Sequence, residues 1–268
     1  MNGFTLWVGL GAGLGLWRMA RSAPQQQSRV WANVGLLVLL VGLIGARASY
    51  VWINWAYFAN QPAEAFQIWS GGLTWPGAVT GAVLAYLFLA FLNRPPRHRA
   101  GARDRRPSLR RIPFGWLADR LYPLLPPLAV TVWLANWQAG IAYGAPLPDG
   151  TWWGVPSLDD SGVYRLHVPL QLLSALTLLL YFWLLEVRVK PLRPPGLLSG
   201  LGILGLLLNL IVVSLLRADP SPHWNGLRVD AWIALLCSAL FLACTGIYNL
   251  LLRAGRKQHF ANPERFSP

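Results

Sequence analysis

Charged residues are scarce in this sequence, and acidic residues are the scarcest. Only 12% of the residues are charged, and the chain has 10 Asp and Glu against 23 Lys and Arg. A soluble domain averages about a quarter charged residues. Apolar residues make up 54% of the chain, and the mean hydropathy is +0.40. The scarcity of charge therefore argues against an ordinary soluble domain and predicts a chain that is embedded in a membrane.

The sequence also lacks the residue clusters that mark several common kinds of site. Its two cysteines, Cys237 and Cys244, stand on one expected helix, where they cannot easily form a disulfide and serve as small packing residues. The four histidines form no metal-ligand pattern. We find neither a phosphate-binding loop of the Walker type nor a serine-hydrolase elbow. No metal or other cofactor is therefore expected.

What the sequence does have is a series of long apolar stretches. They lie at about 4–20, 30–53, 72–92, 121–143, 168–187, 197–216 and 230–252. A helix needs about 20 mostly apolar residues to cross a membrane, so the sequence predicts an all-α integral membrane protein with seven transmembrane helices. These leave no room for a separate soluble domain, so residues 1–268 are expected to form one polytopic domain. Between the helices we expect a flexible basic loop at about 93–113 and a larger loop at about 144–167.

The basic residues predict how the helices are oriented. Of the 23 Lys and Arg, 19 lie in the first, third and fifth connections and in the C-terminal tail. The other connections hold only Arg165, Arg217 and Arg228. Cytoplasmic loops are enriched in Lys and Arg, so the N-terminus is expected outside and the C-terminus in the cytoplasm. Orientation and anionic headgroups explain the net charge of +13, so nucleic acid is not expected as a partner.

Arg47 stands out because it lies inside the second apolar stretch. An arginine at mid-depth in a membrane costs at least ~2.5–3.5 kcal/mol on insertion scales. Two interpretations remain open. The side chain extends to the outer headgroups, or the guanidinium faces an internal cavity and binds a phosphate, whose oxygens match its fork.

Three more polar residues are candidates for a site. Arg217 ends the sixth stretch against the orientation bias, and it either pairs with Asp219 or belongs to a site. His167 precedes the fifth stretch. It is the best-placed general base because histidine titrates near neutrality, although a residue at a helix start would look the same. Asn136 lies at membrane depth, where polar side chains usually face the bundle interior or a wet cavity.

Residues 71–81 begin the third stretch and are rich in Gly and other small residues. Gly and Pro permit a broken backbone where helix ends line a cavity. Small residues also allow helices to pack closely. Both interpretations remain open for this segment.

Several short motifs follow one another along most of the chain. Residues 45–51 are GARASYV, and residues 71–81 are GGLTWPGAVTG. Further positions follow in order: Ala118, Asp119, Pro123, Leu124, Asn136, Gly140, Gly144, Pro169, Gln171, Leu172, Arg217, Asp219, Pro220, Gly226, Leu227 and Trp232. Together they resemble the phosphatidylglycerol–prolipoprotein diacylglyceryl transferase family, whose motifs include G-[GA]-R-x-G-Y-V and G-G-[ML]-S-F-H-G-G-L-I-G. The resemblance implies a multi-pass protein of the bacterial inner membrane, with seven spans and a central cavity accessible to lipid.

The resemblance also implies a reaction and its partners. Members of the family move a diacylglyceryl group from phosphatidylglycerol to a cysteine thiol of an exported prolipoprotein, without a cofactor. The expected partners are phosphatidylglycerol, the prolipoprotein signal segment and membrane lipids. The resemblance assigns substrate binding to the residues that match the family's motifs: Arg47, Asn136, Gly140, Gly144, Gln171 and Arg217. His167 then serves as the base that takes the thiol proton.

The sequence also departs from the family at several polar positions. Histidine, arginine and glutamate residues of the family's motifs are replaced here by Pro76, Trp133, Ile141, Val168, Leu210 and Ser214. Two hypotheses therefore stay open. One is a divergent transferase with a rebuilt site, and the other is a catalytically degenerate member that binds lipid or lipoprotein without chemistry.

Overall fold

The computed structural model is mostly helical and describes residues 3–93, 114–158, 162–189 and 194–261. The basic loop predicted at 93–113 therefore lies, beyond its first residue, outside the described residues. The chain divides into two compact units. Unit 1 consists of Met1–Leu206 and Leu216–Pro220, and unit 2 of Leu207–Leu215 and Ser221–Pro268. That both units form a single polytopic domain stays a prediction.

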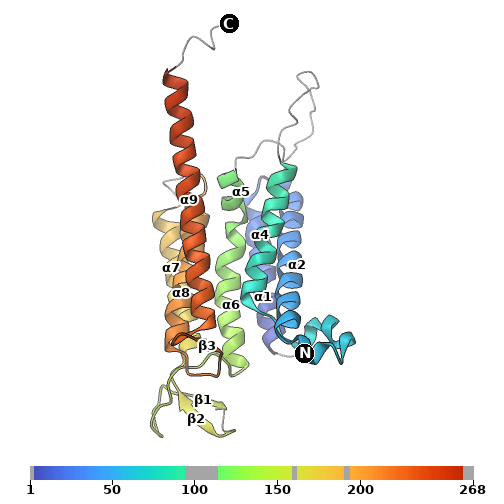
Figure 1. Ribbon diagram of the computed structural model, residues 1–268, viewed down its shortest axis with the longest axis vertical. Helices are drawn as coiled ribbons and strands as arrows, with labels where there is room; N and C mark the ends of the chain where they lie inside the picture. The colour runs from blue at the N-terminus through green and yellow to red at the C-terminus, as the bar shows by residue number, and fades with distance from the viewer. Residues whose placement is uncertain (1–2, 94–113, 159–161, 190–193, 262–268) are drawn as a thin grey trace. The chain divides into compact units, whose positions relative to one another are not determined.

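Unit 1 contains most of the helices and one β-hairpin. Its helices are α1 (Gly3–Ser22), α2 (Ser28–Ile53), α3 (Trp55–Phe58), α4 (Trp75–Leu92), α5 (Phe114–Leu121), α6 (Leu125–Gln138), α7 (Leu170–Arg188) and the first part of α8 (Leu197–Leu216). Strands β1 (Val155–Leu158) and β2 (Tyr164–His167) pair antiparallel, with Val155 opposite His167. The start of α1, the end of α2 and this hairpin lie at the same end of the unit (Figure 1).

Unit 2 contains the second part of α8, a short hairpin and α9 (Val229–Ala261). The hairpin pairs β3 (His223–Trp224) with β4 (Leu227–Arg228) in antiparallel register. The Trp232 indole donates a hydrogen bond to the Trp224 carbonyl over 2.9 Å. The hairpin is thereby held against the first turn of α9.

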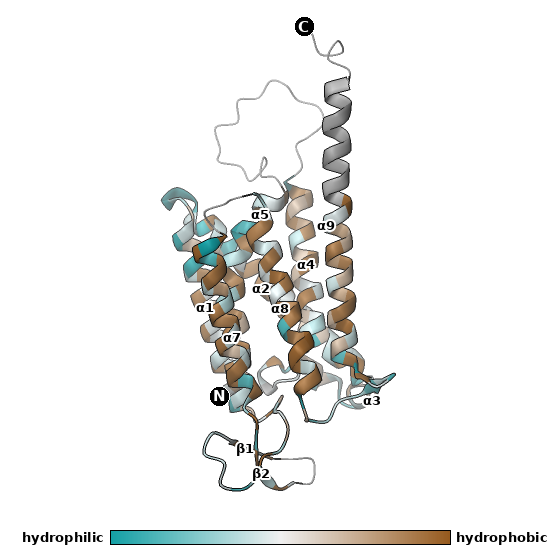
Figure 2. Ribbon diagram, turned by 90° about the vertical axis from the view of Figure 1, so that its left-hand side faces the viewer, coloured by the Kyte–Doolittle hydropathy of each residue, from teal (hydrophilic) through white to brown (hydrophobic). Residues whose placement is uncertain are grey.

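Five helices in the described part of the chain are long and apolar enough to cross a membrane. They are Gln25–Ile53, Trp75–Leu92, Leu170–Arg188, Leu197–Leu216 and Val229–Ile247. Figure 2 shows apolar residues along these helices and hydrophilic residues gathered nearer their ends. This pattern is expected of membrane helices, because apolar side chains favour the hydrocarbon and polar side chains favour the water-facing ends. The mostly helical structure and its five candidate spans agree with the predicted all-α membrane class, while α1 and α6 as further spans, the orientation and the cavity stay predictions.

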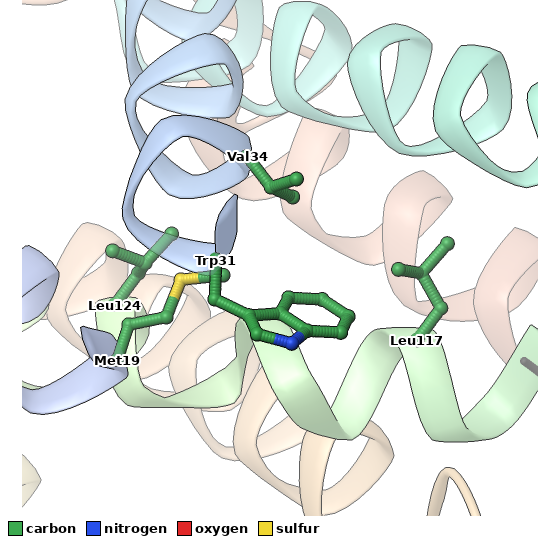
Figure 3. Close-up of a cluster of buried hydrophobic side chains, with 5 residues drawn as sticks. All are labelled: Met19, Trp31, Val34, Leu117 and Leu124. Atoms are coloured by element: carbon green, nitrogen blue, oxygen red, sulfur yellow. The ribbon is translucent and has the colours of Figure 1, made fainter. Parts of the chain in front are cut away.

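A buried apolar cluster joins four segments of unit 1. Met19 of α1, Trp31 and Val34 of α2, and Leu117 of α5 meet Leu124, which lies just before α6 (Figure 3). Trp31 and Met19 are each only 1% exposed. Helices in a membrane associate through close packing of side chains rather than through removal of apolar surface from water, so the contacts of these five residues hold the segments together.

Glycines allow α2 and α4 to pack backbone against backbone. A Cβ atom on Gly45 would lie 2.4 Å from the Gly77 carbonyl oxygen, and one on Gly77 would lie 2.3 Å from the Gly45 oxygen. A Cβ atom on Gly81 would lie 2.3 Å from the Val41 oxygen. Of the two interpretations of residues 71–81, the structure supports close packing at these glycines.

We expect Gly77→Ala to lower the melting temperature of the protein. Its methyl group would push α2 and α4 apart, and overpacking of this kind costs about 1–3 kcal/mol. Gly13→Ala in α1 is the matched control, because nothing lies within 4 Å of a Cβ atom there. Thermal unfolding in detergent measures both variants. A melting temperature that is the same for Gly77→Ala and Gly13→Ala would contradict the backbone contact.

Candidate functional site

A tight turn carries the chain out of α6. Gly140 has a φ of +66°, and Ala142 follows with a φ of +63°. The Ile141 amide donates to the Asn136 carbonyl over 3.1 Å. Side chains crowd the backbone in this left-handed conformation, so glycine at 140 has a local reason, which is to let the chain leave the helix. Asn136 itself is half-buried in the last turn of α6.

Gly144 lies where this turn meets the start of α7. Its amide donates to the Val168 carbonyl over 3.0 Å, and the Val168 amide donates back to Ala145 over 3.0 Å. A Cβ atom on Gly144 would lie 2.9 Å from the Val168 Cβ and the Leu170 Cγ atoms. The absent side chain is therefore what allows the two segments to lie together.

His167 is buried beside Tyr143. It is 3% exposed, and its ring centroid lies 4.4 Å from that of Tyr143. The Nδ1 atom lies 3.0 Å from the Arg165 carbonyl oxygen. A carbonyl oxygen only accepts hydrogen bonds, so Nδ1 carries the proton and donates it. In the neutral ring Nε2 is then the unprotonated nitrogen, which is the atom that a general base needs.

Gln171 stands in the first turn of α7 and is 1% exposed. Its Nε2 atom donates to the Ile141 carbonyl over 2.7 Å. Its Oε1 atom is buried and accepts no hydrogen bond from the described residues. A buried acceptor without a donor costs about 1–3 kcal/mol, so this oxygen is suited to a hydroxyl or amide of a bound molecule.

Arg217 is paired with Asp219. Its Nε atom donates to Asp219 Oδ1 over 2.8 Å, and its Nη2 atom donates to Oδ2. The Ala218 amide between them donates to the Tyr143 carbonyl over 2.9 Å. The pairing considered from the sequence is thus confirmed, and it fixes a cation beside Tyr143, whose ring contacts His167.

Arg47 belongs to a different group of residues. Its Nε atom donates to the Ala65 carbonyl over 2.9 Å and its Nη2 atom to Glu64 over 2.5 Å. Its Nη1 atom donates to Gly71 over 2.7 Å and to Gly72 over 3.2 Å. The side chain is 7% exposed, so it is buried under the loop before α4. Its assignment to the lipid phosphate stays a prediction.

The structure therefore brings four of the predicted residues together, through Tyr143 and the turn after α6: Gly144, His167, Gln171 and Arg217. Gly140 shapes the turn that leads to them. Two positions where the family has polar residues lie on the same part of the chain. Trp133 is buried in α6, and Ile141 is 48% exposed. Neither side chain supplies a charge.

Sequence analysis missed Tyr143, which joins His167 to the Arg217 segment. Its place directly before Gly144 is the single signal that could have indicated it. The left-handed conformation of Ala142 was also missed, because alanine gives no indication of a positive φ.

Comparison with known proteins agrees with the resemblance. Residues 1–247 match the family described as prolipoprotein diacylglyceryl transferase. A protein of Nitratidesulfovibrio vulgaris is 29% identical over 87% of this chain and 78% of its own length. One of Parasynechococcus marenigrum is 28% identical over 90% of this chain and 84% of its own. One of Bacillus licheniformis is 35% identical over 85 residues, a stretch that covers 31% of this chain and 32% of that relative. All three are named phosphatidylglycerol–prolipoprotein diacylglyceryl transferase.

Proposed function

Because this chain belongs to the prolipoprotein diacylglyceryl transferase family, we propose that it transfers diacylglyceryl from phosphatidylglycerol to the lipobox cysteine of exported prolipoproteins. The relatives that match most of the chain carry the name of that reaction. The alternative, a degenerate member that only binds lipid or lipoprotein, is not favoured by these matches. The proposed partners are phosphatidylglycerol, the prolipoprotein signal segment and membrane lipids.

The proposal includes the membrane topology. α1 and α6 complete seven spans, with the N-terminus outside and the C-terminus in the cytoplasm of a bacterial inner-membrane protein. The alternation of basic loops supports this orientation. In unit 1 the start of α1, the end of α2 and the β1–β2 hairpin share one end, as expected if all three lie on the same side of the membrane. The cavity that admits lipid would open near this end, where the His167 cluster lies.

The single observation that carries the chemistry is the hydrogen bond of His167. Because Nδ1 donates to the Arg165 carbonyl, Nε2 is the atom that takes the proton of the substrate thiol. The thiolate sulfur attacks the glycerol carbon that bears the phosphate oxygen, and a thioether bond forms. The bond between that carbon and the oxygen breaks, its electron pair goes to the oxygen, and glycerol phosphate leaves.

The remaining residues bind and position the lipid in this proposal. Arg217, oriented by Asp219, stabilises the charge that gathers on the leaving phosphate. Gln171 Oε1 accepts a hydrogen bond from a headgroup hydroxyl, and the half-buried Asn136 amide contacts headgroup oxygens. Arg47 adds positive charge from the loop before α4. The predicted substrate-binding set also includes two residues whose lack of a side chain shapes the backbone: Gly140 and Gly144.

We expect the purified chain to transfer labelled diacylglyceryl from phosphatidylglycerol to a lipobox peptide. The transferase of Nitratidesulfovibrio vulgaris, which covers most of this chain, serves as the positive control under the same conditions. Mass spectrometry of the peptide detects the thioether product. If the relative is active and this chain is folded but inactive, the transferase proposal fails and the degenerate, binding-only member takes its place.

A further inference from the structure

Residues 52–69, which we call the platform, begin with the last two residues of α2 and extend to the side of this helix. They lie to the right of the N label in Figure 1, and Figure 2 labels α3 within them. Their large apolar side chains face outward: Trp52, Ile53, Trp55, Phe66 and Trp69 are 79%, 67%, 62%, 80% and 68% exposed. Large apolar side chains exposed in this number on one short segment favour an apolar neighbour.

The platform carries little charge, and its carboxylate is hydrogen-bonded within the platform. Its single Asp or Glu is Glu64, and it has neither Lys nor Arg. The Tyr57 hydroxyl donates to Glu64 Oε2 over 2.6 Å. This hydrogen bond raises the pKa of Tyr57 above its ordinary value, with burial and the charge of Glu64 as smaller causes. The carboxylate is thereby turned toward the platform's own hydroxyl group.

Arg47 hydrogen-bonds backbone carbonyls both in the platform and in the residues between the platform and α4. It donates to the carbonyls of residues 64, 65, 71 and 72. Its guanidinium also lies over the rings of Phe58 at 5.3 Å and Tyr50 at 5.6 Å. Irregular backbone near lipid is tolerated where the protein supplies its missing hydrogen bonds. A guanidinium can serve several carbonyls at once because its donors form a rigid planar fork.

We infer that the platform lies in the headgroup region of the membrane, with its aromatic side chains in lipid and Arg47 as the anchor that holds it there. The platform continues from Gln25–Ile53 and precedes Trp75–Leu92, which are both candidate spans. Trp and Tyr favour this depth because one part of each ring is polar. The sideways direction from α2 places the platform along the membrane surface. The inference does not require the chain to be an active transferase.

A fluorescent probe at residue 66 tests this placement. Phe66→Cys is labelled with an environment-sensitive dye in a full chain that carries Cys237→Ala and Cys244→Ala. The protein is reconstituted in vesicles of phosphatidylcholine and phosphatidylglycerol. Trp152→Cys is the matched control, because Trp152 is an aromatic residue that is 92% exposed in the loop before β1. We expect blue-shifted emission and quenching by lipids with a doxyl group near the headgroup at residue 66, and quenching by aqueous iodide at residue 152.

Two outcomes would overturn the placement. In the first, iodide quenches the probe at residue 66 as strongly as the probe at residue 152. In the second, iodide protection at residue 66 arises only after a lipobox peptide is added, which would make the platform a protein-docking surface. Neither measurement uses turnover, so a failure of the transferase proposal would leave the result intact.

Variants of the anchor test the role of Arg47. Arg47→Lys keeps the charge but loses the fork, so we expect it to lose the doxyl quenching at residue 66. Gly72→Ala perturbs the same region without changing Arg47, because its Cβ atom would lie 2.7 Å from Arg47 Nη1 and 2.5 Å from the Tyr50 ring. Thermal unfolding identifies variants that fail to fold. Full doxyl quenching in a folded Arg47→Lys or Gly72→Ala protein would refute the anchor.

Discussion

Replacement of His167 by glutamine is expected to reduce kcat for diacylglyceryl transfer by about 10²–10⁴-fold, the range that a positioned acid or base contributes. Glutamine preserves part of the volume beside Tyr143 but cannot take a proton from the thiol. The substrate-binding residues remain, so KM should change little. Steady-state transfer from labelled phosphatidylglycerol to a lipobox peptide measures both constants.

Two comparisons separate this role from a packing role. His223→Gln is the matched control, because His223 is an exposed histidine in β3, and its kcat should equal that of the unchanged protein. The melting temperature of His167→Gln should stay close to that of the unchanged protein. A loss of activity that scales with a loss of stability would instead assign His167 to packing against Tyr143.

The helices could be predicted from the sequence because lipid restricts what a backbone can do. The stretches predicted at 30–53 and 197–216 agree with α2 and α8. A long apolar run in a membrane has to pair its own amides and carbonyls, and the helix achieves this locally. The predicted stretch 121–143 is only partly α6, which begins at Leu125 and ends at Gln138, where the turn at Gly140 follows. A glycine in an apolar run does not by itself predict that turn.

The β1–β2 hairpin could not be predicted in the same way. Its strands have four residues each, too few for an alternating pattern to stand out from chance. Pro156 lies within β1 and argues against a strand, since proline is confined to edge strands and bulges. β1 is paired with β2 alone among the named strands, so the proline is tolerated. Non-local pairing of this kind leaves little trace in a local sequence.

The residue types of the candidate site could be predicted from the sequence more readily than the contacts between those residues. The pair Arg217 and Asp219 is visible in the sequence because the two residues are close along the chain. The contact of His167 with Tyr143 depends on the pairing of residues 144 and 145 with Val168. The partners of Arg47 are carbonyl groups, which every residue possesses, so no residue type could indicate them. Contacts to backbone carbonyls are therefore the part of the site that sequence reasoning misses.

Replacement of Arg217 by lysine is expected to lower kcat/KM by about 10²–10³-fold, the loss that follows removal of one preorganised electrostatic donor. Lysine keeps the charge but cannot form the paired hydrogen bonds that orient Arg217 on Asp219. Arg188→Lys, at an exposed arginine near the end of α7, should leave kcat/KM unchanged.

A substitution of Asp219 distinguishes a role of Arg217 as a cation from a purely structural role. Asp219→Asn retains the guanidinium near Tyr143, so we expect a smaller loss of kcat/KM than for Arg217→Lys. The two substitutions should be non-additive in the double variant, because the residues share one interaction. Transfer kinetics and thermal unfolding of the two single variants and the double variant complete this double-mutant cycle. If Asp219→Asn loses as much activity as Arg217→Lys, with an equal fall in melting temperature, the pair only holds the chain at Tyr143. The leaving phosphate would then require another cation, and Arg47 would have to leave its carbonyl partners to provide it.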